Sequence, residues 1–225
     1  MYSKRNETAV PTRTEQEAVV LVHGLWLSGW CLVLLRRHLQ RCGFSATHAF
    51  SYQSVSRDLL ENGTALNTYL LTVAAPTVHL VGHSLGGLVI RALFQQYPRQ
   101  RPGRIVTLGS PHRGSQPAKV LARNAMGRCI TGRSIAQVVA GIPEQWPLPP
   151  RDFGVIAGSM SLGLGRLVTR MPKPNDGVVA LTETLLPGAT DHIVFHVSHT
   201  ALVASRRVAD QVCRFLKNGR FQHQG

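Results

Sequence analysis

The sequence predicts an α/β fold in which a mostly parallel sheet of about six strands has helices on both faces. Three observations support this prediction. Short apolar runs typical of buried strands alternate with longer segments of helical period. The 225 residues suit one domain with a sizeable core, and 44% hydrophobic and 16% charged residues are an ordinary globular mixture.

Each element follows from its local pattern. We expect a strand where a short apolar run ends at glycine, at polar residues or at turn residues. We expect a helix where apolar residues recur on one helical face and a stop signal follows, such as Gly43 or Pro98. Gly63 is a weak point in the second helix, and the fourth is loosely defined. The predicted strands are 18–24, 46–52, 77–82, 104–110, 153–159 and 192–198, and the predicted helices are 28–43, 56–73, 85–97, 115–141 and the amphipathic end of 200–219.

The predicted organisation is a polar N-terminal segment over residues 1–17 and one domain over 18–219, in which 111–151 forms a small cap at most. The N-terminal segment lacks the apolar stretch of a signal peptide, and no apolar run is long enough to span a bilayer. The four cysteines have no CxxC or metal-ligand spacing, so we expect reduced thiols in a cytoplasmic protein, with no metal and no cofactor.

The charge is strongly basic, with 25 Lys and Arg against 11 Asp and Glu. Between Glu61 and Glu144 there is no acidic residue, and this stretch carries nine basic ones. A positive surface favours anionic partners, which suggests an anionic membrane surface, peripherally at its inner face, or a negatively charged substrate. No interleaved aromatic pattern or nucleic-acid motif is present, so nucleic acid is not expected and a merely solvated basic face is the alternative.

One serine stands where a strand turns abruptly into a helix. In "LVGHSLGGLVIRAL" (80–93), Ser84 follows the strand 77–82 and lies between Gly82 and Gly86. Glycines at these two positions let strand and helix approach closely around a strained serine, and the helix N-terminus favours an oxyanion. This strand–turn–helix context for G-x-S-x-G predicts that Ser84 is a nucleophile.

A nucleophilic serine requires a base and an orienting acid at the same edge of the sheet. Of the ten histidines, His199 follows the last strand and precedes the last helix, so it is the expected base. Asp176, in "NDGVV" (175–179), follows the fifth strand and is the expected acid, with Glu183 as its nearest rival. Asp191 precedes a strand and so lies at the wrong edge. His23, His83 and His112 flank turns and are expected to shape the backbone.

The sequence resembles the α/β-hydrolase superfamily, in particular bacterial triacylglycerol lipases and related esterases. The resemblance rests on "VHGL" (22–25), "GHSLGG" (82–87), "TLGSPHRGS" (107–115), "NDGVV" (175–179) and "VSHTAL" (197–202), and spans most of the chain. It implies an oxyanion hole formed by the backbone N–H groups of Leu25 and Leu85. The chain departs from the family in lacking its first antiparallel strands and a clear amphipathic lid.

The expected function is hydrolysis of carboxylic esters, as in lipases and esterases, through a Ser84–His199–Asp176 triad and an acyl-enzyme. Trp26, Leu27 and Trp30 follow the first strand and line an apolar acyl site in this interpretation, whereas packing of both tryptophans in the core is the alternative. A thioesterase or acyltransferase on the same triad remains open, as do a peptidase, a carbon–carbon hydrolase and a non-catalytic hydrolase-fold binding protein.

Overall fold

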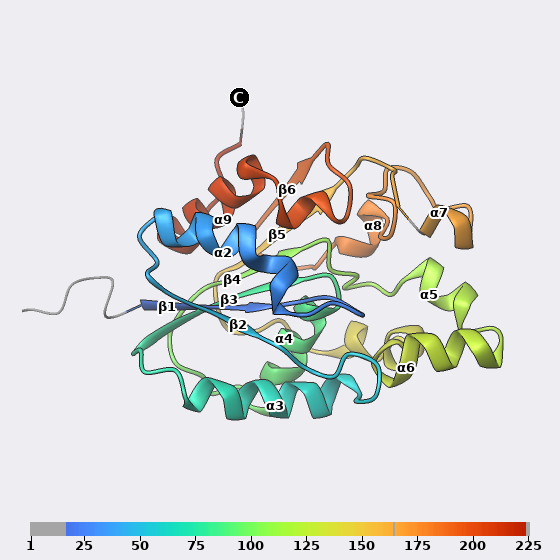
Figure 1. Cartoon of the computed structure of the whole chain (residues 1–225), viewed down its shortest axis with the longest axis horizontal. Helices are drawn as coiled ribbons and strands as arrows, with labels where there is room; N and C mark the ends of the chain where they lie inside the picture. Colours follow the sequence, from blue (N-terminus) through green and yellow to red (C-terminus); the bar gives the residue numbers. More distant parts are fainter. Residues whose placement is uncertain (1–16, 164, 224–225) are drawn as a thin grey trace, which may run out of the picture.

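A six-stranded parallel sheet runs through the middle of the molecule (Figure 1). The computed structural model describes residues 17–163 and 165–223, so the N-terminal segment expected over 1–17 lies outside the described residues except for Glu17. Every pairing in the sheet is parallel, with strand order β2-β1-β3-β4-β5-β6. The strands are β1 (Glu17–Val22), β2 (Ala46–Phe50), β3 (Thr77–His83), β4 (Ile105–Leu108), β5 (Phe153–Gly158) and β6 (Asp191–Phe195).

Helices cover both faces of this sheet (Figure 1). α3 (Leu59–Leu71) and α4 (Leu85–Gln96) pack on one face, and α2 (Val33–Arg41) and α9 (Arg206–Asn218) pack on the other. Further helices lie in the connections between the strands and after the last strand. They are the 3-10 helices η1 (Gly29–Leu32), η2 (Ile142–Gln145) and η3 (Ala201–Val203), and the helices α5 (Gln116–Leu121), α6 (Ala125–Val139), α7 (Gly165–Val168) and α8 (Leu181–Thr184).

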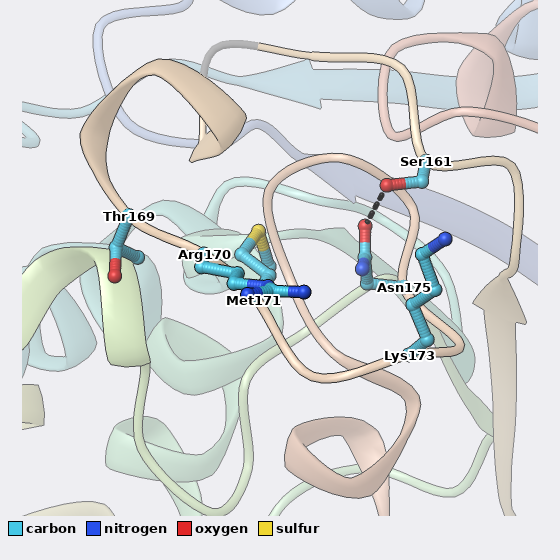
Figure 2. Close-up of a pocket in the computed structure, with 6 residues that line it drawn as sticks. All are labelled: Ser161, Thr169, Arg170, Met171, Lys173 and Asn175. Carbon is cyan, nitrogen blue, oxygen red and sulfur yellow. Dashed lines mark hydrogen bonds between the residues drawn. The ribbon is translucent and has the colours of Figure 1, made fainter.

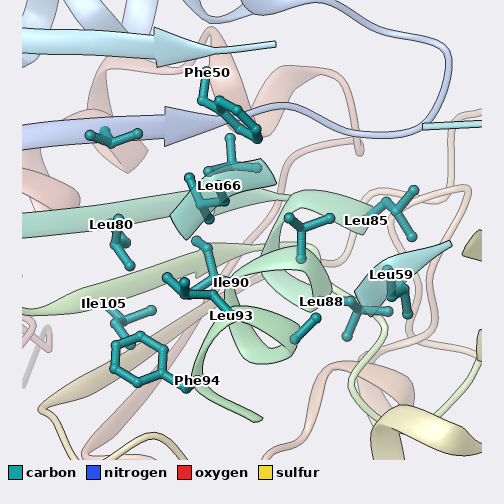
Figure 3. Close-up of a cluster of buried hydrophobic side chains, with 14 of the residues drawn as sticks. Phe50, Leu59, Leu66, Leu80, Leu85, Leu88, Ile90, Leu93, Phe94 and Ile105 are labelled. Atoms are coloured by element: carbon teal, nitrogen blue, oxygen red, sulfur yellow. The ribbon is translucent and has the colours of Figure 1, made fainter. Parts of the chain in front are cut away.

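The core consists of two apolar layers, one on each face of the sheet. On the α3–α4 side, Leu66, Leu88 and Ile90 pack against Leu80 and Ile105 of the strands (Figure 3). On the other side, α2 and α9 pack against alternate strand residues in the same way. Side chains on both faces of the inner strands β1, β3, β4 and β5 are therefore buried, which explains why these strands are near-continuous apolar runs in the sequence. The edge strands β2 and β6 are only partly buried.

All six expected strands are present, and the expected fold class is confirmed. The expected helix 28–43 is divided into η1 and α2, and the loosely helical 115–141 into α5 and α6. Gly132 interrupts α6 with a φ of 75°. A Cβ there would lie 2.2 Å from the carbonyl oxygen of Val55, so only glycine lets the α6 backbone approach the backbone of Val55 this closely. The four-residue helices α7 and α8 were not predicted, because one turn leaves no periodic signal.

The expectation of reduced thiols is wrong for two of the four cysteines. Cys42, directly after α2, and Cys213 of α9 form a disulfide, with Cα atoms 6.3 Å apart. Cys31 and Cys129 are free. The bonded pair is separated by 171 residues, so only the packing of α2 on α9 brings the two sulfur atoms together, and spacing in the sequence gives no sign of it.

Gly63 does not interrupt α3, because the helices make close backbone contact there. A Cβ at this position would lie 2.9 Å from the backbone of Ala92 and Leu93 in α4. Gly63→Ala should therefore lower the free energy of unfolding by about 1–3 kcal/mol, although alanine is normally the better helix former. Urea unfolding followed by circular dichroism measures this difference.

Thr68→Ala is the matched control, since Thr68 is an exposed position of the same helix. It should change the free energy of unfolding by less than about 0.5 kcal/mol. Equal stability of Gly63→Ala and the parent protein would mean that α3 and α4 can separate without cost.

Candidate active site

Ser84 lies on a strained turn between β3 and α4. Its φ of 53° and ψ of −123° are unusual for a residue with a side chain. The Ser84 N–H donates to the carbonyl oxygen of Leu108 at 2.8 Å, which fixes the turn on the neighbouring strand β4. A Cβ on Gly82 would lie 2.6 Å from Gly87, and one on Gly86 would lie 2.2 Å from the carbonyl oxygen of Val22. Only glycine permits this turn, as the motif predicts.

Asp176 and His199 lie together at the same edge of the sheet. His199 Nδ1 is 2.7 Å from Asp176 Oδ2, and the His199 N–H donates to the Asp176 carbonyl oxygen at 2.9 Å. A carboxylate only accepts hydrogen bonds, so this partner assigns the proton to Nδ1 and leaves Nε2 with its lone pair. Asp176 is fully buried, and its Oδ1 accepts the N–H groups of Val178 and Val179 at 2.9 and 2.7 Å.

Ser84 is joined to His199 through their immediate neighbours. His83 Nε2 donates to the His199 carbonyl oxygen at 3.1 Å, and the two rings lie 4.8 Å apart. Gly109 follows the Leu108 that binds Ser84, and a Cβ on Gly109 would lie 3.1 Å from His199 Nδ1. No hydrogen bond links the Ser84 and His199 side chains in the described structure, and such bonds are often long until substrate binds.

Burial keeps the supporting histidine neutral. Desolvation lowers the pKa of His83 to about 3, and the neighbouring His199 acts in the same direction. A neutral His83 can donate through Nε2 without adding a positive charge beside His199. The expectation that His83 shapes the backbone therefore fits a specific contact, the one to the His199 carbonyl group.

Side-chain contacts hold the loop after β1 against the segment that follows β2. His23 Nδ1 donates to the Gly24 carbonyl oxygen at 2.8 Å, and Tyr52 stacks on the His23 ring and donates its hydroxyl to the His23 carbonyl oxygen. Trp26 adopts a φ of 58°, and its N–H donates to Ser54 Oγ at 3.1 Å. Tyr52 and Ser54 were missed in the sequence, although their place just after β2 puts them at this edge.

The two backbone amides expected to form an oxyanion hole come from the loop after β1 and from the start of α4. Leu85 is the first residue of α4, and Leu25 follows Gly24, whose Cβ position is 3.0 Å from Ser84 Cβ. Neither the Leu25 nor the Leu85 N–H has an acceptor among the described residues. Both therefore remain available to an oxygen atom of a ligand.

The three residues expected to line an acyl site lie at the surface. Trp26 is 54% exposed, Leu27 40% and Trp30 84%, so the alternative that both tryptophans pack in the core is wrong. Trp26 Nε1 donates to the Ile130 carbonyl oxygen of α6 at 2.9 Å. Ile130 and Met126 of α6 are also exposed. We call Trp26, Leu27, Trp30, Met126 and Ile130 the apolar rim.

A cavity of about 630 Å³ lies beside the acid loop rather than at Ser84 (Figure 2). Asn175, the residue before Asp176, points into this region and accepts a hydrogen bond from Ser161 Oγ at 2.7 Å (Figure 2). Asn175 also accepts the Gly177 N–H, so its side chain holds the turn that carries Asp176. The cavity is lined by Ser161, Thr169, Arg170, Met171, Lys173 and Asn175, and by none of the residues of the apolar rim.

Glu183, the rival acid, does not contact His199. Its carboxylate accepts the N–H groups of Gln116 and Ala180, and so joins the first turns of α5 and α8. Burial raises the pKa of Glu183. Asp191 lies at the opposite edge of the sheet, where it accepts the Phe221 N–H and contacts His223.

The basic stretch without acids does not form a single face. Arg91 is buried in α4 and donates to the Trp146 carbonyl oxygen at 2.7 Å. Arg101 binds carbonyl groups at the end of α3, and Arg104 pairs with Asp152 at the amino edge of the sheet. Exposed Arg128, in α6, lies two residues from both Met126 and Ile130 in the chain, and exposed Arg123, in the turn before α6, lies three residues from Met126.

A family model described as a domain of unknown function (DUF7379) matches residues 2–158. The chain belongs to this family. The matched DUF7379 region contains β1 to β5 and Ser84, whereas Asp176 and His199 lie beyond it. No curated protein matches the sequence.

Solved structures resemble the DUF7379 chain closely in fold. The mature form of the Bacillus licheniformis lipase BlEst2 has a TM-score of 0.75 at 19% identity, covering 94% of both chains. The phospholipase PlaB from Legionella pneumophila has a TM-score of 0.69 at 14% identity, covering 91% of this chain and 60% of that one. The metagenomic carboxyl esterase MGS0156 has a TM-score of 0.63 at 16% identity, covering 87% and 69%.

These likenesses show the α/β-hydrolase fold, which confirms the resemblance seen in the sequence. At such identities they establish the fold alone, and function depends on the site. None of the helices in residues 17–163 and 165–223 is both long and apolar enough to cross a membrane.

Proposed function

We propose that this protein is a serine hydrolase of carboxylic esters, with Ser84 as nucleophile, His199 as base and Asp176 as the orienting acid. The observation that carries the proposal is the 2.7 Å contact between His199 Nδ1 and Asp176 Oδ2 beside the strained Ser84 turn. A neutral imidazole oriented by a buried carboxylate has the tautomer that general-base catalysis by Nε2 requires. Three separate chain segments supply these groups, as in other serine hydrolases.

In the proposed reaction, His199 Nε2 takes the proton of Ser84 Oγ as this oxygen attacks the ester carbonyl carbon. The carbonyl oxygen becomes an oxyanion, to which the N–H groups of Leu25 and Leu85 donate. Protonated His199 then gives its proton to the departing alkoxide, which leaves as an alcohol and yields the acyl-enzyme. A water molecule, deprotonated by His199, releases the carboxylic acid and restores Ser84.

Asp176 contributes by fixing the imidazole and by stabilising its transient positive charge. Three donors already satisfy its carboxylate, namely His199 Nδ1 and the amides of Val178 and Val179. These bonds hold the buried carboxylate in a fixed orientation. The ion therefore need not reorganise when His199 takes up a proton.

The proposed substrate is an ester with an apolar acyl group, and the apolar rim is its proposed entrance. The exposed side chains of Trp26, Leu27 and Trp30, which follow Leu25 in the chain, favour contact with a hydrocarbon chain. The names of the structurally similar proteins, a lipase, a phospholipase and a carboxyl esterase, agree with this choice. We further propose that 18–219 acts as one hydrolase domain, with 111–151 as a small cap.

We also propose that the apolar rim meets an anionic lipid surface, such as the inner face of a cytoplasmic membrane. Tryptophan is favoured at membrane interfaces, and the net charge of +14 attracts anionic headgroups. Exposed Arg123 lies within three residues of Met126 in the chain, and exposed Arg128 within three residues of both Met126 and Ile130, so cationic and apolar side chains alternate in this segment.

Ser84→Ala should abolish hydrolysis of p-nitrophenyl esters and labelling by a fluorophosphonate, since both need the hydroxyl group. A series of acyl lengths, with acyl-thioesters in parallel, identifies the preferred substrate of the parent protein. Circular dichroism should show an unchanged fold. Turnover by a folded Ser84→Ala protein at the parent rate would assign the reaction to another nucleophile.

Asp176→Asn should lower kcat by roughly 10³–10⁴-fold. An amide can still accept the Val178 and Val179 N–H groups through its oxygen, but its NH₂ then opposes His199 Nδ1–H. Asp191→Asn is the matched control, because it removes the same charge at the other edge of the sheet, and it should leave kcat within about twofold. Similar losses in both variants would argue against Asp176 as the acid.

Binding to vesicles with anionic lipid should fall steeply between low and physiological salt, whereas binding to neutral vesicles should stay weak. Each basic residue near an acidic membrane contributes about 1 kcal/mol, and the attraction decays over a Debye length of about 8 Å. Arg123→Glu and Trp30→Ala should each weaken binding in a flotation assay. Arg99→Glu, an equal charge change beyond the C-terminal end of α4, should weaken it less, and equal effects of both arginine variants would contradict a defined surface.

A further inference from the structure

A second group of reactive side chains lies between α2 and α9, outside the candidate active site. His38 of α2 lies one helical turn before Cys42, and one ligand atom from each of His38, Cys42 and Cys213 falls within 4.8 Å of the others. α2 and α9 lie side by side on the same face of the sheet (Figure 1). The spacing in the sequence gives no indication of this group, because the two helices lie far apart in the chain.

The imidazole of this group already has an orienting partner. His38 Nε2 lies 2.8 Å from Asp210 Oδ1, and Asp210 is one turn before Cys213 in α9. This contact fixes the ring between the helices and leaves Nδ1 of the same ring without a hydrogen-bond partner among the described residues. A histidine that donates one N–H to a carboxylate while the other nitrogen binds a metal is the usual arrangement of protein zinc ligands.

The surroundings also suit a soft metal ion. Cys213 is 5% exposed and packs with Val212 and Phe215 in the core, whereas the His38 side chain is 20% exposed. The site therefore has an apolar floor and an opening to solvent. A divalent ion bound by two thiolates carries no net positive charge, so it adds no repulsion to two helices that already contain several arginines.

We propose that His38, Cys42 and Cys213 form a Zn²⁺ site that exists only when the Cys42–Cys213 disulfide is reduced, with solvent as the fourth ligand and Asp210 orienting His38. The same pair of helices is then cross-linked in two ways, by a disulfide under oxidising conditions and by zinc in a reducing compartment. This proposal is independent of the proposed ester hydrolysis.

The conversion balances with an external dithiol as reductant. The dithiol passes two electrons and two protons to the disulfide, the S–S bond breaks, two cysteine thiols form, and the dithiol becomes a disulfide itself. Binding of Zn²⁺ then displaces the two thiol protons to solvent, because thiolates are the ligands. Oxidised sulfur atoms in the disulfide cannot act as thiolate ligands, so the two states exclude each other.

The test uses the full chain with Cys31→Ser and Cys129→Ser, which leaves only the pair in question. The protein is reduced with a phosphine, freed of reductant without oxygen, and titrated with Zn²⁺ or Co²⁺ alone. We expect one ion per reduced chain and none per oxidised chain, with thiolate-to-cobalt charge-transfer bands. Zinc should also raise the Tm of the reduced protein by several degrees.

Variants separate the ligands from their surroundings. Cys42→Ser and Cys213→Ser should each remove the charge-transfer bands and the zinc-dependent shift in Tm, and Asp210→Asn should weaken zinc binding by about 10–100-fold. Binding that persists in Cys42→Ser, a reduced protein without cobalt–thiolate bands, or two titratable thiols in the air-oxidised protein would each overturn the proposal. Circular dichroism of each variant shows that the helices are still folded.

Discussion

The contact on which the candidate site depends is made by backbone atoms alone. The N-terminus of α4 lies so close to β1 and β3 that Gly82 and Gly86 have no space for a Cβ atom. This approach forces the positive φ of Ser84 and presents its side chain at the carboxyl edge of the sheet. It also places the first amide of α4 next to the loop after β1. A larger residue at either glycine would separate these elements and dismantle the site together with the turn.

The parallel sheet then assembles the remaining groups by geometry. In a parallel sheet all carboxyl ends meet at one edge, so residues distant in the chain become neighbours there. Ser84 follows β3, Asp176 follows β5 and His199 follows β6, while Leu108 of β4 fixes the serine turn. The order of the strands in the sheet is therefore enough to bring these residues to one edge. The DUF7379 match ends with β5, so the described chain completes the edge with residues beyond the matched region.

Much of this arrangement could be predicted, because it depends on local signals at strand ends. Apolar runs located all six strands. The rule that active-site groups follow the carboxyl ends of strands selected Asp176 and His199, and His199 Nδ1 lies 2.7 Å from Asp176 Oδ2. Contacts between distant helices carry no such signal. The disulfide of Cys42 with Cys213 was therefore missed, and Gly63 was interpreted as a weak point when it is a close contact with α4. Exposure of Trp26 and Trp30 also depends on tertiary structure.

The helix that follows Ser84 has consequences for how such proteins can diversify. Every residue of α4 from Leu85 to Phe94 is buried, including Arg91, which is bound to the Trp146 carbonyl group. This buried part of α4 can accept few substitutions, since each one disturbs packing on the sheet or on α3. We therefore expect substitutions to be tolerated better in the loop after β1 and in residues 111–151, which carry the exposed side chains of the apolar rim.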